Sequence, residues 1–60
     1  MELTAHCQRY EGWIIVNVPE IEGLRTQAKR VNQVEAMVRD GAALLTGRPK
    51  SFFDVRIAWE

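Results

Sequence analysis

The chain holds one histidine, His6, and one cysteine, Cys7, and these are its first candidates for catalysis. An imidazole can act as a general base near neutral pH, but no acid or nucleophile stands at a spacing that places it beside His6. Cys7 alternates with Leu3 and Ala5, which predicts a buried thiol, whereas reactive cysteines need a partly exposed, electropositive setting. The sequence therefore predicts no catalytic residue.

Metal and cofactor sites are not expected either. Glu20 and Glu22 lie in one loop, but two carboxylates are too few to cage a divalent cation, and no Asp/Asn/Gly loop pattern accompanies them. A single cysteine and a single histidine also cannot form a zinc cage. The four glycines are isolated, so there is no phosphate-binding loop. The sequence predicts a non-enzymatic protein without cofactors.

The basic residues are better candidates for a contact. The formal net charge is zero, but six of the eight bases lie between residues 25 and 50. Lys29 and Arg30 directly precede a predicted helix, where the helix macrodipole disfavours cations. We expect Arg25, Lys29 and Arg30 to contact an acidic protein or a phosphate; the alternative is that they serve only solubility. The basic footprint is too sparse to predict direct nucleic-acid binding by this chain alone.

Four segments show the alternation or β-branched composition typical of strands. Glu11-Gly12 is a turn signal, so the first two strands are expected to form an antiparallel hairpin, and Pro19 ends the second. The apolar positions of the first three strands should share one face of the sheet. The expected strands are residues 3–8, 13–18, 24–28 and 53–59.

One amphipathic helix is expected before the last strand. Asn32-x-x-Glu35 is a variant of the capping box that begins a helix, and Gly47 is a natural C-cap near Thr46. Gly41 lies in the apolar stripe, where a missing side chain would let the helix lie close against a sheet. The stripe consists of Val34, Met37, Val38, Leu44 and Leu45. These elements predict an α+β fold, an antiparallel three- to four-stranded sheet with one helix on one face, in the order β-β-β-α-β.

A single helix leaves the other face of the sheet open. Trp13 and Ile15 are expected on that face together with Phe52, and an exposed apolar patch in a small protein suggests self-association. The alternative is that these residues cover one another. A 60-residue chain without a disulfide is marginally stable alone, which also favours a homodimer. The sequence shows no signal peptide and no membrane-spanning stretch, and the free Cys7 predicts the cytoplasm.

The stretch from Gly12 to Gly23 reads Gly-Trp-Ile-Ile-Val-Asn-Val-Pro-Glu-Ile-Glu-Gly and continues as Leu-Arg-Thr-Gln-Ala before the helix. This pattern resembles the N-terminal domain of HicB-type antitoxins. The shared features are an aromatic strand, Val-Pro-acid-hydrophobic-x-Gly, a short strand with Thr-Gln and a helix containing Glu and Ala. The similarity covers residues 10–47, and the segment from Val18 to Gly23 is its most specific part.

The resemblance implies a partial RNase H-like fold and a partner, a small HicA-type ribonuclease toxin that the antitoxin blocks. Such antitoxins often carry a separate C-terminal DNA-binding domain; residues 1–60 are expected to form a single HicB-like domain without one. The opening strand lacks the acid that RNase H chemistry needs, so no nuclease activity is expected. Two alternatives remain, a solitary structural or regulatory homologue without a toxin and a small dimeric DNA-binding repressor. The second is weaker, because such repressors need a second helix.

Overall fold

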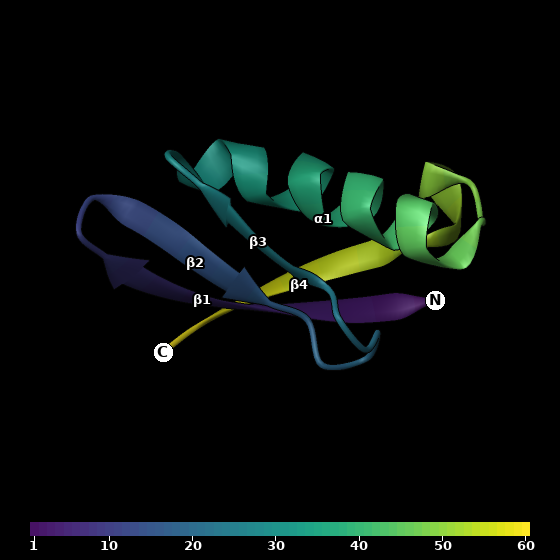
Figure 1. Ribbon diagram of the computed structural model, residues 1–60, viewed down its shortest axis with the longest axis horizontal. Helices are drawn as coiled ribbons and strands as arrows, with labels where there is room; N and C mark the ends of the chain where they lie inside the picture. Colours follow the sequence, from purple (N-terminus) through teal and green to yellow (C-terminus); the bar gives the residue numbers. More distant parts are fainter.

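One long helix lies across one face of a four-stranded sheet in the computed structural model, which describes residues 1–60 (Figure 1). The element order is β-β-β-α-β, as the sequence predicted, with one additional 3-10 turn before the last strand. The elements are β1 (Glu2–Tyr10), β2 (Trp13–Asn17), β3 (Arg25–Ala28), α1 (Val31–Thr46), η1 (Lys50–Phe52) and β4 (Asp54–Trp59).

The sheet has the strand order β3-β2-β1-β4 and is mixed, so the expectation of a purely antiparallel sheet is wrong. β1, β2 and β3 pair antiparallel, but β4 runs parallel to β1, with Leu3 opposite Val55 and Cys7 opposite Trp59. The reason is the crossover between β3 and β4. The helix returns the chain to the end of the sheet where β1 begins, so β4 starts beside β1 and follows its direction.

The core lies between the helix and the sheet and consists only of apolar side chains. The predicted alternation of β1, β2 and β3 is confirmed, because the predicted inward positions are buried except for Thr26 of β3, which is half-buried. Phe53 joins the core from the end of η1. The buried residues are Leu3, Ala5, Cys7, Ile14, Val16, Val18, Leu24, Ala28, Val34, Val38, Ala42 and Phe53.

The helix begins two residues earlier than expected. Its N-cap is Arg30, whose side chain accepts no capping hydrogen bond, and only the second half of a capping box is present, from Gln33 rather than Glu35. The Arg30 backbone N–H donates to Gln33 Oε1 at 3.1 Å, and the Gln33 N–H donates to the Arg30 carbonyl at 3.1 Å. A glutamine at the third helical position performs this role as well as a glutamate does. The expected end is confirmed, since Gly47 caps the helix in the left-handed conformation with φ 75°.

Gly41 lies at a close approach of the helix to a side chain of the layer below. A Cβ atom at this position would lie 2.7 Å from Cδ1 of Leu24, which is buried just before β3. Carbon atoms in contact normally stand about 3.5–4.0 Å apart. The interpretation of Gly41 as a packing glycine is therefore confirmed, and the contact is with a side chain that borders the sheet.

Leu44 and Leu45 do not belong to the buried stripe, which corrects the helical-wheel prediction. Leu44 is 88% exposed and Leu45 is 54% exposed. The last turn of α1 lies at the end of the sheet where β1 begins, so little of the sheet lies beneath it (Figure 1). The stripe that is actually buried is Val34, Val38 and Ala42, with Met37 half-buried beside it.

Candidate protein-interaction surfaces

The face of the sheet that the helix leaves open combines polar and apolar side chains. Trp13 and Ile15 of β2 lie on it and are half-buried, which confirms their predicted placement. The neighbouring positions carry Gln8 of β1 opposite Ile15 and Gln27 of β3 on its other side. An apolar centre within a polar surround is typical of protein-interaction surfaces.

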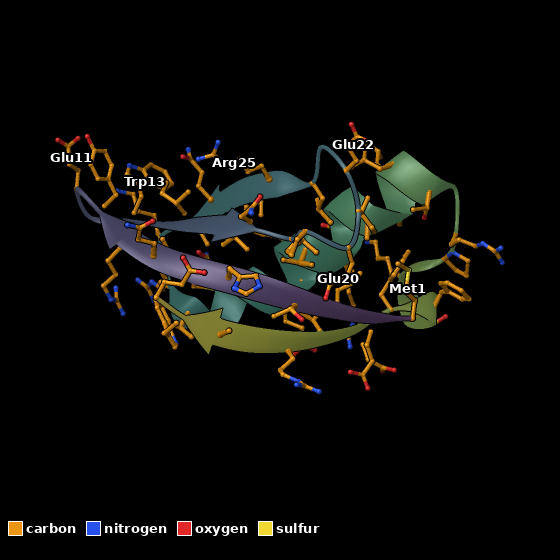
Figure 2. All side chains as sticks on the ribbon, turned by 90° about the horizontal axis from the view of Figure 1, so that it is seen from below. Met1, Glu11, Trp13, Glu20, Glu22 and Arg25 are labelled. Carbon is orange, nitrogen blue, oxygen red and sulfur yellow. The ribbon has the colours of Figure 1, made fainter.

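Trp13 is covered by a charged side chain rather than by another aromatic ring. Lys29 Nζ lies 4.0 Å from the centre of the Trp13 ring, a cation–π contact. Figure 2 shows Trp13 next to the turn that holds Glu11, and Arg25 farther along the same margin of the sheet. Sequence reasoning missed the Lys29–Trp13 contact, because Trp13 begins β2 and Lys29 follows β3, so their distance depends on the register of the two strands.

Phe52 lies far from Trp13. Its carbonyl accepts from the amino group of Met1 at 2.7 Å, and Met1 stands at the opposite end of the sheet from Trp13 (Figure 2). Phe52 packs edge-to-face on Phe53, and Arg48 lies 4.8 Å above its ring. Trp13 and Ile15 therefore form one surface, and Phe52 belongs to another.

The three predicted contact bases all lie along β3 and the connection to the helix. Arg25 begins β3, Lys29 follows it, and Arg30 is the N-cap of α1; all three are exposed. No carboxylate oxygen lies within 4.0 Å of the side-chain nitrogens of these three residues, and the ion pairs of the chain involve other residues. Those pairs are His6–Glu60, Arg39–Glu35, Lys50–Asp40 and Arg56–Glu2.

A groove of about 400 Å³ runs between β3 and the first half of the helix. Trp13 and Ala28 line it from the sheet, and Ala36 and Met37 line it from the helix. Lys29 forms part of its rim. We call this groove, together with the free outer side of β3, the β3 edge.

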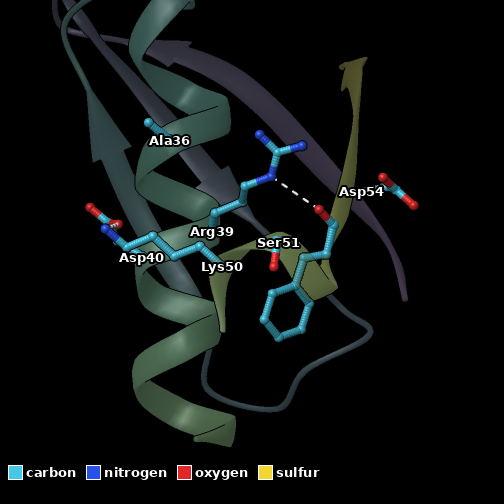
Figure 3. Close-up of a pocket in the computed structure, with 7 residues that line it drawn as sticks. Ala36, Arg39, Asp40, Lys50, Ser51 and Asp54 are labelled. Carbon is cyan, nitrogen blue, oxygen red and sulfur yellow. Dashed lines mark hydrogen bonds and ion pairs between the residues drawn. The ribbon is translucent and has the colours of Figure 1, made fainter. Parts of the chain in front are cut away.

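A second groove of about 660 Å³ lies on the other side of the helix, against η1 and the start of β4 (Figure 3). Three of its four charged side chains are already paired, and Asp54 is the exception. Arg39 Nε donates to the carbonyl of Phe53 at 3.0 Å, its guanidinium also binds Glu35, and Lys50 Nζ lies 2.7 Å from Asp40 Oδ1. These contacts connect the helix to η1 and to Phe53, the residue before β4, so we interpret this groove as structural.

His6 has one charged neighbour that the sequence did not reveal. Its Nδ1 lies 2.9 Å from Oε2 of Glu60, which follows β4. The parallel pairing of β1 and β4 brings these two residues together, and only the correct strand direction could have predicted it. The pair lines a shallow depression of the open face with Gln8, Asn17 and Arg25, without a nucleophile among them.

Glu20 is more than a solvated loop charge. Its Oε1 accepts a hydrogen bond from the Thr4 backbone N–H at 3.0 Å, at the level where β2 has already ended. The hydrogen bond favours the charged form and lowers the pKa of the Glu20 carboxyl. Because β2 ends at Asn17, Glu20 supplies the Thr4 N–H with the hydrogen-bond acceptor that a longer β2 would otherwise have provided.

Cys7 is fully buried, as expected, and its Sγ lies 3.5 Å from the carbonyl of Ala5. Burial raises the pKa of the Cys7 thiol, because the thiolate would lose its hydration. No three His, Cys, Asp or Glu side chains come together in a group suited to a metal ion. No helix has the length and apolarity needed to cross a membrane.

The likeness of this chain to other proteins was tested by three comparisons. No protein-family model, no curated protein and no solved structure matches it.

Proposed function

We propose that this chain is a non-enzymatic protein-binding module of the HicB-like type, which acts in the cytoplasm and blocks a small HicA-type ribonuclease toxin. The observation that carries protein binding is the β3 edge, where an apolar groove with Lys29 on its rim lies beside Arg25 and Arg30, and none of the three bases has an acidic partner in an ion pair. The toxin as partner rests on the resemblance of residues 10–47 to HicB-type domains.

The proposed mechanism is occlusion. The module would cover the RNA-binding or catalytic surface of the toxin and would need no chemistry of its own. Its accessible side chains suit this role, because the one thiol is buried and the histidine faces a carboxylate without a nucleophile nearby. Surface complementarity then determines both affinity and specificity.

Self-association is part of the same proposal. Trp13 and Ile15 would form the contact between two copies through the open face of the sheet, whereas Phe52 would contribute only to a separate contact at the other end. A 60-residue chain gains stability when it associates, because a small core supplies few kcal/mol.

An RNA-cleavage assay tests this function. The protein encoded next to this gene would be purified and incubated with messenger RNA while the present chain is added in increasing amounts. We expect cleavage to fall to background near an equimolar ratio and the chain alone to leave the RNA intact. Cleavage that continues at a tenfold excess would overturn the antitoxin role and favour a solitary homologue.

A further inference from the structure

We infer that the β3 edge is a strand-docking site for an extended, acidic segment of a partner protein that carries one bulky apolar side chain. The inference rests on the proposed function only in taking the ligand to be a protein. Beyond the proposed function, the inference names the surface that binds the partner, the backbone groups that pair with it and the sequence character of the bound segment.

The backbone of β3 offers unused hydrogen-bonding groups on its outer side. The Val18 N–H donates to the Leu24 carbonyl, so this opposite pair is hydrogen-bonded. Hydrogen-bonded and non-hydrogen-bonded pairs alternate along an antiparallel ladder, and Thr26 and Ala28 continue the bonded set. Arg25 and Gln27 therefore turn their N–H and C=O groups away from β2. An added strand can pair with both residues.

The groove gives such a strand its side-chain specificity. Side chains of a strand alternate between the two faces of a sheet. Those on the helix side of an added strand would lie over the part of the groove lined by Ala28, Ala36 and Met37. Its volume of about 400 Å³ has room for one large apolar side chain. The strand therefore needs a bulky apolar residue on that face.

The charges of the β3 edge require an acidic segment. Arg25, Lys29 and Arg30 have no acidic partner, and the first turn of α1 contains no acid that would neutralise them. Glu60 lines the same depression as Arg25, but its ion pair is with His6. Carboxylates of a bound strand would complete this surface, since opposite charges across an interface favour encounter and register.

The other edge of the sheet is less suited to docking. At the start of β4 the Phe53 N–H donates to Lys50, and the Phe53 carbonyl accepts from Arg39. Arg56 of β4 is paired with Glu2 at 3.2 Å. The β4 edge thus begins with occupied backbone groups and carries a neutralised base, whereas the β3 edge has neither.

The test is a chemical-shift titration of the ¹⁵N-labelled chain with synthetic heptapeptides. The probe peptide alternates acidic residues with valine and has leucine at its centre. The first matched peptide has lysine in place of each acid. The second keeps the acids but carries N-methyl groups on the backbone edge that would pair with β3. We expect the acidic peptide to shift the amides of Arg25, Gln27 and Lys29, and both matched peptides to bind at least tenfold more weakly. Equal binding of the lysine peptide, or shifts confined to β4, would overturn the inference.

Variants test the same site from the side of the protein. The double change Arg25→Glu and Lys29→Glu should weaken binding of the acidic peptide by roughly tenfold or more. Arg48→Glu, a control at an exposed base far from β3, should leave it unchanged. Gln27→Pro removes one outward N–H without breaking the β2 ladder and should also weaken binding. Retention of full affinity by the double variant would contradict the proposed docking site.

These results are separable from the antitoxin assay. Peptide binding at the β3 edge without inhibition of the ribonuclease would retain the docking site and reject the toxin as partner. Inhibition that is unaffected by Arg25→Glu and Lys29→Glu would retain the antitoxin role and reject the β3 edge as its binding surface.

Discussion

At the scale of single residues, Glu20 has the clearest consequence for stability. Its lowered pKa means that the folded chain stabilises the carboxylate relative to the unfolded chain. This contribution is present above the unfolded glutamate pKa of about 4.3 and is lost as the pH falls through the lower folded pKa. The Thr4 N–H would otherwise face solvent at the end of β2.

We therefore expect Glu20→Gln to be less stable than the parent at pH 7 and nearly equal to it near pH 2. Urea unfolding at both pH values measures the difference. Glu22→Gln, a change in the same loop at an acid without a recorded hydrogen bond, serves as the control. A Glu20→Gln deficit that stays constant with pH would refute the role of the Thr4 contact.

Glu11 offers a stabilising substitution. It has φ 50° and precedes Gly12 at φ 83° in the turn between β1 and β2. Two positive φ values are typical of a type I′ turn, which prefers Asn-Gly. We expect Glu11→Asn to raise the free energy of unfolding by about 0.5 kcal/mol. Thermal unfolding would show it; a lowered midpoint would contradict this assignment of the turn.

At the scale of elements, Gly41 connects helix propensity to packing. Alanine at this position would gain about 1 kcal/mol in helix propensity. The added Cβ would meet Leu24 at 2.7 Å, and overpacking a core costs about 1–3 kcal/mol. Because Leu24 is buried, its side chain would have to shift within the core to admit the Cβ, and we expect that steric cost to exceed the gain.

Gly41→Ala should accordingly lower the free energy of unfolding by about 1 kcal/mol, as measured by chemical denaturation. Combining it with Leu24→Val should recover part of that loss relative to the sum of the single changes. Ala36 is exposed, so Ala36→Gly measures the difference in helix propensity between alanine and glycine without a change in core packing. A Gly41→Ala variant more stable than the parent would show that the helix does not lie close to Leu24.

The elements also show how far the sequence determines the fold. Alternation identified the buried faces of β1, β2 and β3, because a single helix covers one face and the period of a strand is two. The direction of β4 was not readable, since its own pattern is the same in a parallel and an antiparallel pair. The exposure of Leu44 and Leu45 depends on where the sheet ends beneath the helix.

The candidate site was predictable in part for a similar reason. Lys29 and Arg30 were singled out because cations before a helix do not stabilise it. That Lys29 covers Trp13, and that both border an apolar groove, required the register of β2 against β3. The pairing of His6 with Glu60 likewise required the parallel strand.

At the scale of the whole molecule, the chain is one thin layer of core between a helix and a sheet. Its principal extents are 32 × 17 × 17 Å, and only 12 of 60 residues are buried. The open face of the sheet is the surface through which a second copy could enlarge that core. Trp13 and Ile15 are the residues of this face that would contact the second copy.

Ile15→Asp places a charge in that proposed contact and should convert a dimer into a monomer. Analytical ultracentrifugation would show the change in mass, and circular dichroism would show that the fold remains. Leu44→Asp, at a highly exposed apolar residue on the helix, is the matched control. A dimer that survives Ile15→Asp would exclude this face as the self-association surface.

The central claim, that this chain is a protein-binding module, is tested most directly by light scattering of the chain alone and mixed with the protein encoded next to its gene. We predict a mass of twice 6.9 kDa for the chain alone and a larger, stoichiometric complex in the mixture. Two components that elute separately with unchanged masses would contradict it.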